Sequence, residues 1–188
     1  MRARNLIMTC TLLAGLFSMA GAQEDLRNHP GFVDFRAMDI SGGQEPKVEV
    51  NLKGSLLGLA ARLASEEEPE LSSTLMSLDA IHVEVYDTQD RKADSYVTQL
   101  AETAKGLEKK GWETIVKVRD EGEHAYIAVK EDGNNIVGLV VLAADEKDEI
   151  VLVNIVGNIN LDEIWRVGRE FEIDHLDTVG HQPKKPKG

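Results

Sequence analysis

Cysteine is nearly absent from this chain of 188 residues, whose one such residue is Cys10. Cys10 lies in an N-terminal apolar stretch that we expect to be removed, so the remaining chain would contain no thiol. A chain without thiols cannot form a disulfide, use a cysteine nucleophile or bind a metal ion through thiolates. Its fold must therefore be stabilised by packing.

Long apolar runs and positive charge are also scarce. No uninterrupted apolar run reaches the roughly 18–20 residues that a membrane helix needs. The 21 Lys and Arg residues are outnumbered by 33 Asp and Glu residues, which gives a net charge of −12. Such a chain is repelled by nucleic acids and by anionic membranes. With 42% hydrophobic residues it is too apolar for a disordered protein, and its length favours a single domain.

The first 22 residues have the features of a secretory signal peptide. Arg2 and Arg4 give a positive start, residues 6–19 are apolar, and residues 20–22 are the small residues that precede a cleavage site. An N-terminal membrane anchor is the alternative, although the apolar stretch is short for a span. Because Cys10 lies inside the apolar stretch, we do not expect a lipoprotein. We predict a periplasmic or secreted mature chain with no integral membrane span.

Alternation of apolar and polar residues predicts six strands. The last four follow one another through turn-like connections of hairpin length, which predicts an antiparallel meander. The six segments cover residues 47–52, 81–86, 112–119, 124–131, 135–143 and 149–157.

Three further segments have apolar residues at helical spacing. In residues 55–68 a stripe of leucines should pack against the sheet, and Pro69 marks the end of that helix. A second helix begins near Asp94 and ends before Gly111, a residue type that helix C-termini favour. The expected leucine stripe consists of Leu56, Leu59, Ala60 and Leu63.

The last predicted helix begins at Asn160, which with Glu163 resembles a capping box. We expect this helix to dock on the sheet through Trp165 and Phe171. Its inner face consists of Leu161, Ile164, Trp165, Gly168 and Phe171.

The order of these elements predicts an α+β fold of two layers with a mainly antiparallel sheet. Strand, helix, strand and helix are followed by the four-strand meander and a C-terminal helix. We divide the chain into a signal peptide (1–22), an N-terminal arm (23–45), a single domain (46–174) and a disordered tail (175–188). In the arm, Phe32 and Phe35 should be exposed.

If all the helices cover one face of the sheet, the other face is open. Residues two apart on a strand share a face, so His82 and Glu84 would meet on that open face. We expect this face to be a binding surface, with an ordinary solvent-facing surface as the alternative. No catalytic residue, metal-binding motif or cofactor motif emerges, and the five histidines include no His-x-x-x-His pattern. The candidate binding residues are His82, Glu84, His124 and Tyr126, beside Lys47, Glu49 and Lys130.

Three stretches give the chain a resemblance to a known family. They are Val-Glu-Val-Asn-Leu at residues 48–52, Ile-His-Val-Glu-Val-Tyr at residues 81–86 and the strand-to-helix junction at residues 153–161. The chain resembles the bacterial family called domain of unknown function 4252, over roughly residues 46–171. The resemblance implies a small exported envelope protein without an assigned activity.

Two classes of function remain open. A non-catalytic interaction module is favoured, because the strand and helix patterns are complete while no catalytic constellation emerges. Its partner would be another envelope protein or a second copy of the chain. The alternative is a small hydrolase or metal-dependent enzyme that uses His82, Glu84 and His124. A concave pocket beside these residues would favour the enzyme.

We predict that signal peptidase cleaves the chain after Ala22. Intact-mass measurement on protein from the native host should find Gln23, as such or cyclised, at the N-terminus. A purified chain that retains Arg2, or that carries a lipid on Cys10, would contradict this prediction.

Overall fold

The computed structural model describes most of the region between the expected signal peptide and the C-terminal tail. The signal peptide, the expected contacts of Trp165 and Phe171, and the tail from residue 175 lie outside the described residues. The described residues are 26–38, 40–88, 93–120, 122–145 and 149–162.

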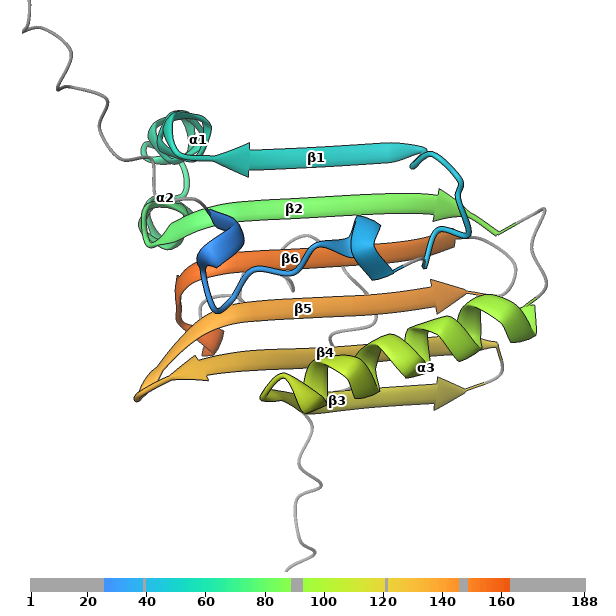
Figure 1. Ribbon diagram of the computed structural model, residues 1–188. Helices are drawn as coiled ribbons and strands as arrows, with labels where there is room; N and C mark the ends of the chain where they lie inside the picture. Colours follow the sequence, from blue (N-terminus) through green and yellow to red (C-terminus); the bar gives the residue numbers. More distant parts are fainter. Residues whose placement is uncertain (1–25, 39, 89–92, 121, 146–148, 163–188) are drawn as a thin grey trace, which may run out of the picture.

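A six-stranded antiparallel sheet forms the centre of the molecule, with strand order β1-β2-β6-β5-β4-β3 (Figure 1). The predicted meander is confirmed, because β3, β4, β5 and β6 pair in succession. Strand β2 then pairs with β6, and β1 pairs with β2 at the edge. The strands are β1 (Val48–Lys53), β2 (Leu78–Asp87), β3 (Trp112–Asp120), β4 (Glu123–Asp132), β5 (Asn135–Asp145) and β6 (Glu149–Ile159).

The α+β class is confirmed, but the order of elements differs from the prediction at the first helix. Instead of one helix over residues 55–68, the chain forms α1 (Ser55–Ala64) and α2 (Pro69–Met76). Pro69 begins a helix rather than ending one. The N–H groups of a helix's first turn have no acceptor within the helix, so a proline there costs no hydrogen bond. The third helix, α3 (Ala93–Lys109), ends as predicted, with Gly111 at φ +79° just beyond it.

The predicted orientation of the first helix is wrong. Its leucines Leu56, Leu59 and Leu63 are 50%, 46% and 75% exposed, whereas Leu57 and Ala61 are buried. Helix α1 carries two apolar stripes, and periodicity alone does not say which of them packs. The stripe that contains the small Ala61 faces the protein and leaves the larger stripe in solvent.

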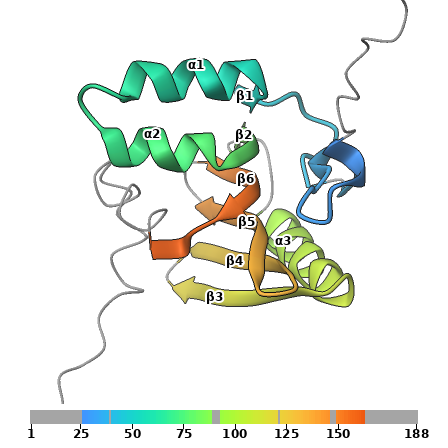
Figure 2. The same cartoon turned by 90° about the vertical axis from the view of Figure 1, so that its left-hand side faces the viewer.

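The helices lie on opposite faces of the sheet (Figure 2). The expectation that all of them cover one face, and that the polar residues lie on an open second face, is therefore wrong. Helix α3 and the N-terminal segment cover one face, which we call the arm face. Helices α1 and α2 lie against one end of the other face, which we call the valine face. The arm face carries the polar side chains of β2, so the face expected to be open is the covered one.

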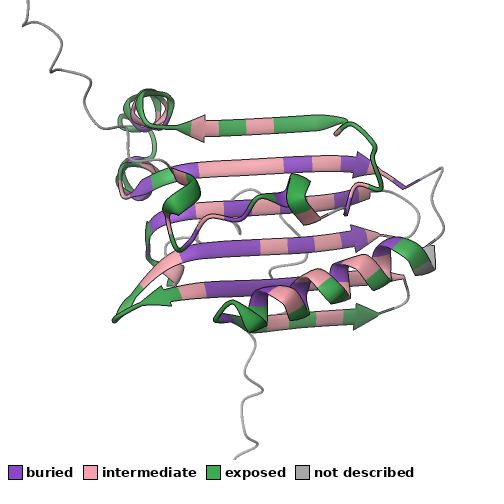
Figure 3. Cartoon of the chain, in the orientation of Figure 1, coloured by how far each residue is buried: buried purple, intermediate pink, exposed green. Residues whose placement is uncertain are grey.

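The main core lies on the arm face, in the central strands (Figure 3). Helix α3 contributes Tyr96, Leu100, Ala104 and Leu107. The sheet side of this core consists of Tyr86, Trp112, Tyr126, Ala128, Val140, Leu142, Ala144, Ile150 and Leu152.

The N-terminal arm completes this core. It contains two 3₁₀ turns, η1 (Leu26–Asn28) and η2 (Phe35–Met38). The expectation that Phe35 is exposed is wrong, because Phe35 is buried together with Val33 and Ile40. At the closest approach to β5, a Cβ atom on Gly138 would lie 2.6 Å from the Cα atom of Gly31, so this contact requires glycine.

Asn154 on β6 joins the arm to the sheet and is fully buried. Its Oδ1 atom accepts a hydrogen bond of 2.9 Å from the backbone N–H of Val33. Its Nδ2 atom donates to the carbonyl oxygens of Gly31, at 3.0 Å, and Leu139, at 3.2 Å. One amide side chain thus satisfies backbone groups of the arm and of strand β5.

We predict that Asn154→Ala destabilises the fold and loosens the arm. Each buried polar group left without a partner costs about 1–3 kcal/mol, so the urea midpoint should fall clearly. Trypsin should also cleave faster at Arg36 in the arm. Asn158→Ala is the matched control, because Asn158 is exposed on the same strand. Equal unfolding free energies for the two variants would contradict the anchoring role.

Candidate functional site

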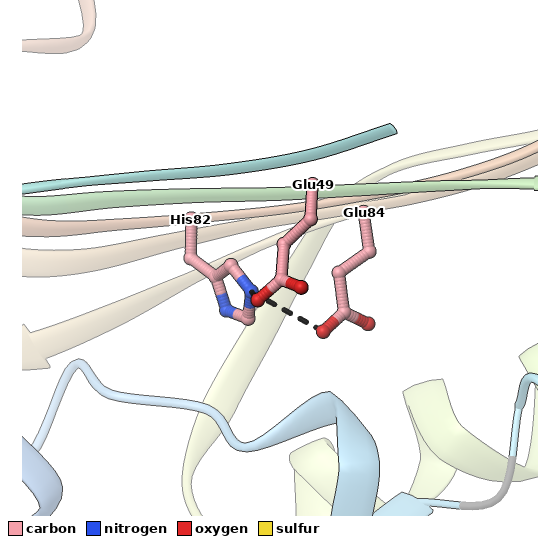
Figure 4. A group of neighbouring side chains, drawn as sticks. All are labelled: Glu49, His82 and Glu84. Carbon is pink, nitrogen blue, oxygen red and sulfur yellow. Dashed lines mark ion pairs between the residues drawn. The ribbon is translucent and has the colours of Figure 1, made fainter. Parts of the chain in front are cut away.

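The candidate site consists of three side chains from the two outermost strands on one side of the sheet. Glu84 on β2 lies directly opposite Glu49 on the edge strand β1. His82 is two residues before Glu84, so all three side chains point to the same face (Figure 4). We call them the Glu49–His82–Glu84 cluster.

The polar atoms of the cluster converge on one point. His82 Nε2 lies 3.2 Å from Glu84 Oε1 and 3.9 Å from Glu49 Oε1. One ligand atom from each residue lies within 4.8 Å of the other two. The side chains of Glu84, His82 and Glu49 are 1%, 16% and 36% exposed, so the cluster extends from the core to the surface at the β1 edge.

Glu84 is a buried carboxylate, and one of its two oxygens accepts a hydrogen bond. Its Oε2 atom accepts a hydrogen bond of 2.7 Å from the hydroxyl of Tyr86. Its Oε1 atom and His82 Nε2 are both buried and have no hydrogen-bond partner among the described residues, although they lie at ion-pair distance. A buried charge is costly unless it is paired, and the groups at ion-pair distance from Oε1 are His82 Nε2 and, at 3.9 Å, Arg36 Nε.

The arm covers the cluster on the side that faces away from the sheet. The ring of Phe35 lies over His82, with 5.8 Å between the ring centroids. Arg36 donates a hydrogen bond of 2.9 Å from Nη2 to Glu49 Oε1, and its Nε atom lies 3.9 Å from Glu84 Oε1. Because the side chain of Arg36 is 70% exposed, its guanidinium borders the open side of the cluster and can be displaced into solvent.

The spacing of the cluster fits a metal ion. In a tetrahedral zinc site with bonds of about 2.0–2.2 Å, ligand atoms lie roughly 3.3–3.6 Å apart. The two separations that involve His82, 3.2 and 3.9 Å, bracket that range, and the two carboxylate atoms lie within 4.8 Å of each other. One imidazole nitrogen and two carboxylate oxygens are ligands that zinc and neighbouring transition metals accept. The hydrogen bond from Tyr86 would orient Glu84 as an outer partner orients a metal ligand.

Burial raises the pKa of the Tyr86 hydroxyl well above its ordinary value near 10, and the hydrogen bond to Glu84 raises the pKa further. Both effects act against the phenolate, because it would lie unsolvated beside a carboxylate. Tyr86 therefore remains a hydrogen-bond donor to Glu84 throughout the physiological pH range.

The structure does not bring the four predicted binding residues together. His82 and Glu84 share the cluster, whereas Tyr126 lies on β4, three strands from β2 in the sheet order. At about 4.8 Å per strand, that separation is roughly 14 Å. Tyr126 is buried and accepts a hydrogen bond of 3.2 Å from Arg119, and the half-buried His124 lies on the same strand.

A hollow of about 330 Å³ lies elsewhere, along helix α3. It shares no lining residue with the cluster, so it gives no support to an enzyme built on His82 and Glu84. Its lining residues are Met38, Gln99, Glu102, Thr103, Gly106 and Lys110.

Sequence reasoning identified His82 and Glu84 but missed most of their surroundings. Strand alternation already placed Glu49 on the same face, and only the β1–β2 register makes it the neighbour of Glu84. Tyr86 continues the same alternation and could have been included. Arg36 and Phe35 had no usable signal, because nothing in a short irregular segment tells which part of the sheet it covers.

Comparisons with known proteins give a family and no activity. The family model described as Domain of unknown function (DUF4252) matches residues 43–167. No curated protein and no solved structure matches the chain. Within the described part of the chain, the helices are too short or too polar to cross a membrane.

We predict that Tyr86 makes stability depend on alkaline pH. A pKa that is higher in the folded state gives stability that is fully present below the unfolded value near 10 and is lost as pH rises through the folded value. The unfolding free energy, measured in urea, should therefore show no loss from Tyr86 up to about pH 9 and should fall as the pH rises past about 10.

Tyr86→Phe should lower stability at pH 8 by about 1–3 kcal/mol, because Glu84 Oε2 loses its donor, and should reduce the alkaline loss. Tyr126→Phe is the control, since it keeps the Tyr86–Glu84 bond and should retain the wild-type alkaline loss. The same pH dependence in all three proteins would show that Tyr86 is not its source.

Proposed function

Because this chain belongs to the DUF4252 family, for which no activity is assigned, we propose a function from its own side chains. The protein is exported to the bacterial envelope and binds a divalent transition-metal ion through the Glu49–His82–Glu84 cluster. The carrying observation is the convergence of three ligand atoms within 4.8 Å, two of them buried without a hydrogen-bond partner among the described residues.

Charge balance supports a divalent cation. The two carboxylates carry a charge of −2, and Arg36, at ion-pair distance from both, supplies +1. A divalent ion that displaces Arg36 would cancel the charge of the two carboxylates. Arg36 lies closer to Glu49 than to Glu84, so it leaves the buried Oε1 atom of Glu84 poorly compensated. An ion pair between His82 and Glu84 is the alternative to a metal ion at Glu84 Oε1. Titration with a metal ion distinguishes these two arrangements.

The ligand set favours transition metals over calcium and magnesium. Ca²⁺ and Mg²⁺ prefer all-oxygen surroundings with six or more ligands, whereas imidazole is a preferred ligand of zinc, copper, nickel and iron. The mature chain that we expect has no thiol, so nitrogen and oxygen are its available metal ligands. Zn²⁺ is the appropriate probe for the site.

Binding rather than catalysis fits the surroundings of the cluster. A catalytic zinc site keeps an open position for substrate beside its protein ligands. Here Phe35 covers His82, Glu84 is fully buried, and the hollow along α3 is lined by other residues. The sequence predicted a binding module that uses an open sheet face. We propose instead that its ligand is a metal ion, bound at a site that the arm covers.

We predict that the chain beginning at Gln23 binds one Zn²⁺ ion saturably. Isothermal titration should give one site, and Zn²⁺ at 100 times Kd should stabilise the fold by about 2.7 kcal/mol. Glu84→Gln should abolish binding, because it removes a ligand charge without changing the side-chain volume. Tyr86→Phe should weaken binding by about 10- to 100-fold, the range seen when the partner that orients a metal ligand is lost.

Glu113→Gln is the matched control, since Glu113 is an exposed carboxylate on the opposite edge strand and should leave binding unchanged. Glu49→Gln keeps the test decisive if Glu84→Gln fails to fold, because Glu49 lies at the surface. Arg36→Ala should strengthen Zn²⁺ binding by removing a competing cation. Absence of saturable heat with the unaltered chain, or equal losses in Glu49→Gln and Glu113→Gln, would overturn the proposal.

A further inference from the structure

The valine face of the sheet is apolar across all six strands. Cross-strand pairing aligns its side chains into two rows that contain no polar or charged residue. The first row consists of Val48, Val85, Val151, Ala143, Ala125 and Val118, and the second of Val50, Val83, Val153, Val141, Ile127 and Val116.

Helices α1 and α2 pack at one end of this face. Leu57 of α1 and Leu75 of α2 belong to the second hydrophobic cluster, together with a third row of the face and three residues of the second row, Val116, Ile127 and Val141. No residue of the first row belongs to that cluster. In the first two rows Ile127 is buried and Val48 is 44% exposed, while the other residues are half-buried. A continuous apolar surface of this kind marks a place where another element docks. The third row consists of Leu52, Ile81, Ile155, Leu139 and Val129.

We propose that residues 160–171 of the same chain cover the valine face as an amphipathic helix. The chain leaves β6 on this face, because Leu161 packs against the second hydrophobic cluster. The helix start is in place, since Leu161 and Asp162 have helical backbone and Asn160 Oδ1 accepts a hydrogen bond of 3.1 Å from the backbone N–H of Asp162.

The length and pattern of this segment match the surface. A helix of twelve residues is about 18 Å long at 1.5 Å per residue. The third and first rows are four residues apart along a strand, which is roughly 13 Å. The stripe of Leu161, Ile164, Trp165, Gly168 and Phe171 supplies two large aromatic rings for the flat valine surface, and the opposite side is charged.

Two other arrangements compete with this one. A second copy of the chain could cover the face, but two chains with a net charge of −12 repel each other. The segment could instead pack on the exposed leucine stripe of α1, although Leu161 already packs against the second hydrophobic cluster, which contains none of those exposed leucines. The experiment below gives each arrangement a different outcome.

Limited trypsin digestion of the chain beginning at Gln23 tests the proposal, because Arg166 and Arg169 lie within the segment. A docked helix protects both arginines, so cleavage at Arg166 should be much slower than cleavage at Lys184 in the tail, as measured by intact mass. Val153→Lys places a charge in the middle of the valine face and should accelerate cleavage at Arg166 by about tenfold or more, since cleavage follows the open population.

Leu63→Lys is the matched variant, because it makes the same chemical change on the leucine stripe of α1 and should leave Arg166 protected. Trp165→Ala, which alters the segment and no strand, should also accelerate cleavage, and it decides the test if Val153→Lys fails to fold. Cleavage at Arg166 as fast as at Lys184 in the unaltered chain would overturn the proposal. So would acceleration by Leu63→Lys alone, or a dimer in light scattering that Val153→Lys converts to a monomer without exposing Arg166.

Discussion

The side-chain amide of Asn154 is the contact on which the rest of the arm face depends. Its three hydrogen bonds join Gly31 and Val33 of the arm to strand β6, on which it lies, and to Leu139 of the neighbouring strand β5. By fixing Gly31 and Val33 over the centre of the sheet, it directs the next residues of the chain across β2. Phe35 then lies on His82, and Arg36 reaches Glu49 at the edge.

This arrangement changes the chemistry of a strand that looks ordinary in isolation. Without the arm, the face of β2 that carries His82 and Glu84 would be solvated, and its charges would cost little. Beneath the arm, Glu84 has to be compensated inside the protein by Tyr86, His82 and Arg36. The candidate site is therefore a product of two distant segments, one irregular and one extended.

The sheet could be predicted from sequence because its signal is local. Each strand alternates, and short turns join the last four, so their order followed directly. Which face is covered could not be predicted in this way. Leu56 and Leu57 belong to competing stripes of one helix, and the arm lacks periodicity, so long-range packing decides both cases. Alternation placed the three cluster residues on one face, while Arg36 and Phe35 depend on an arm whose course only the folded structure reveals.

The contact between the arm and Asn154 also orders events in time. Their hydrogen bonds join residues 121 and 123 positions apart in the chain. During synthesis the arm emerges early, whereas β6, which lies between β2 and β5, emerges last among the strands. The two halves of the sheet cannot join, and the arm has no place to dock, until that strand is available. Such non-local closure slows folding, so the arm stays undocked until the last strand of the sheet is in place.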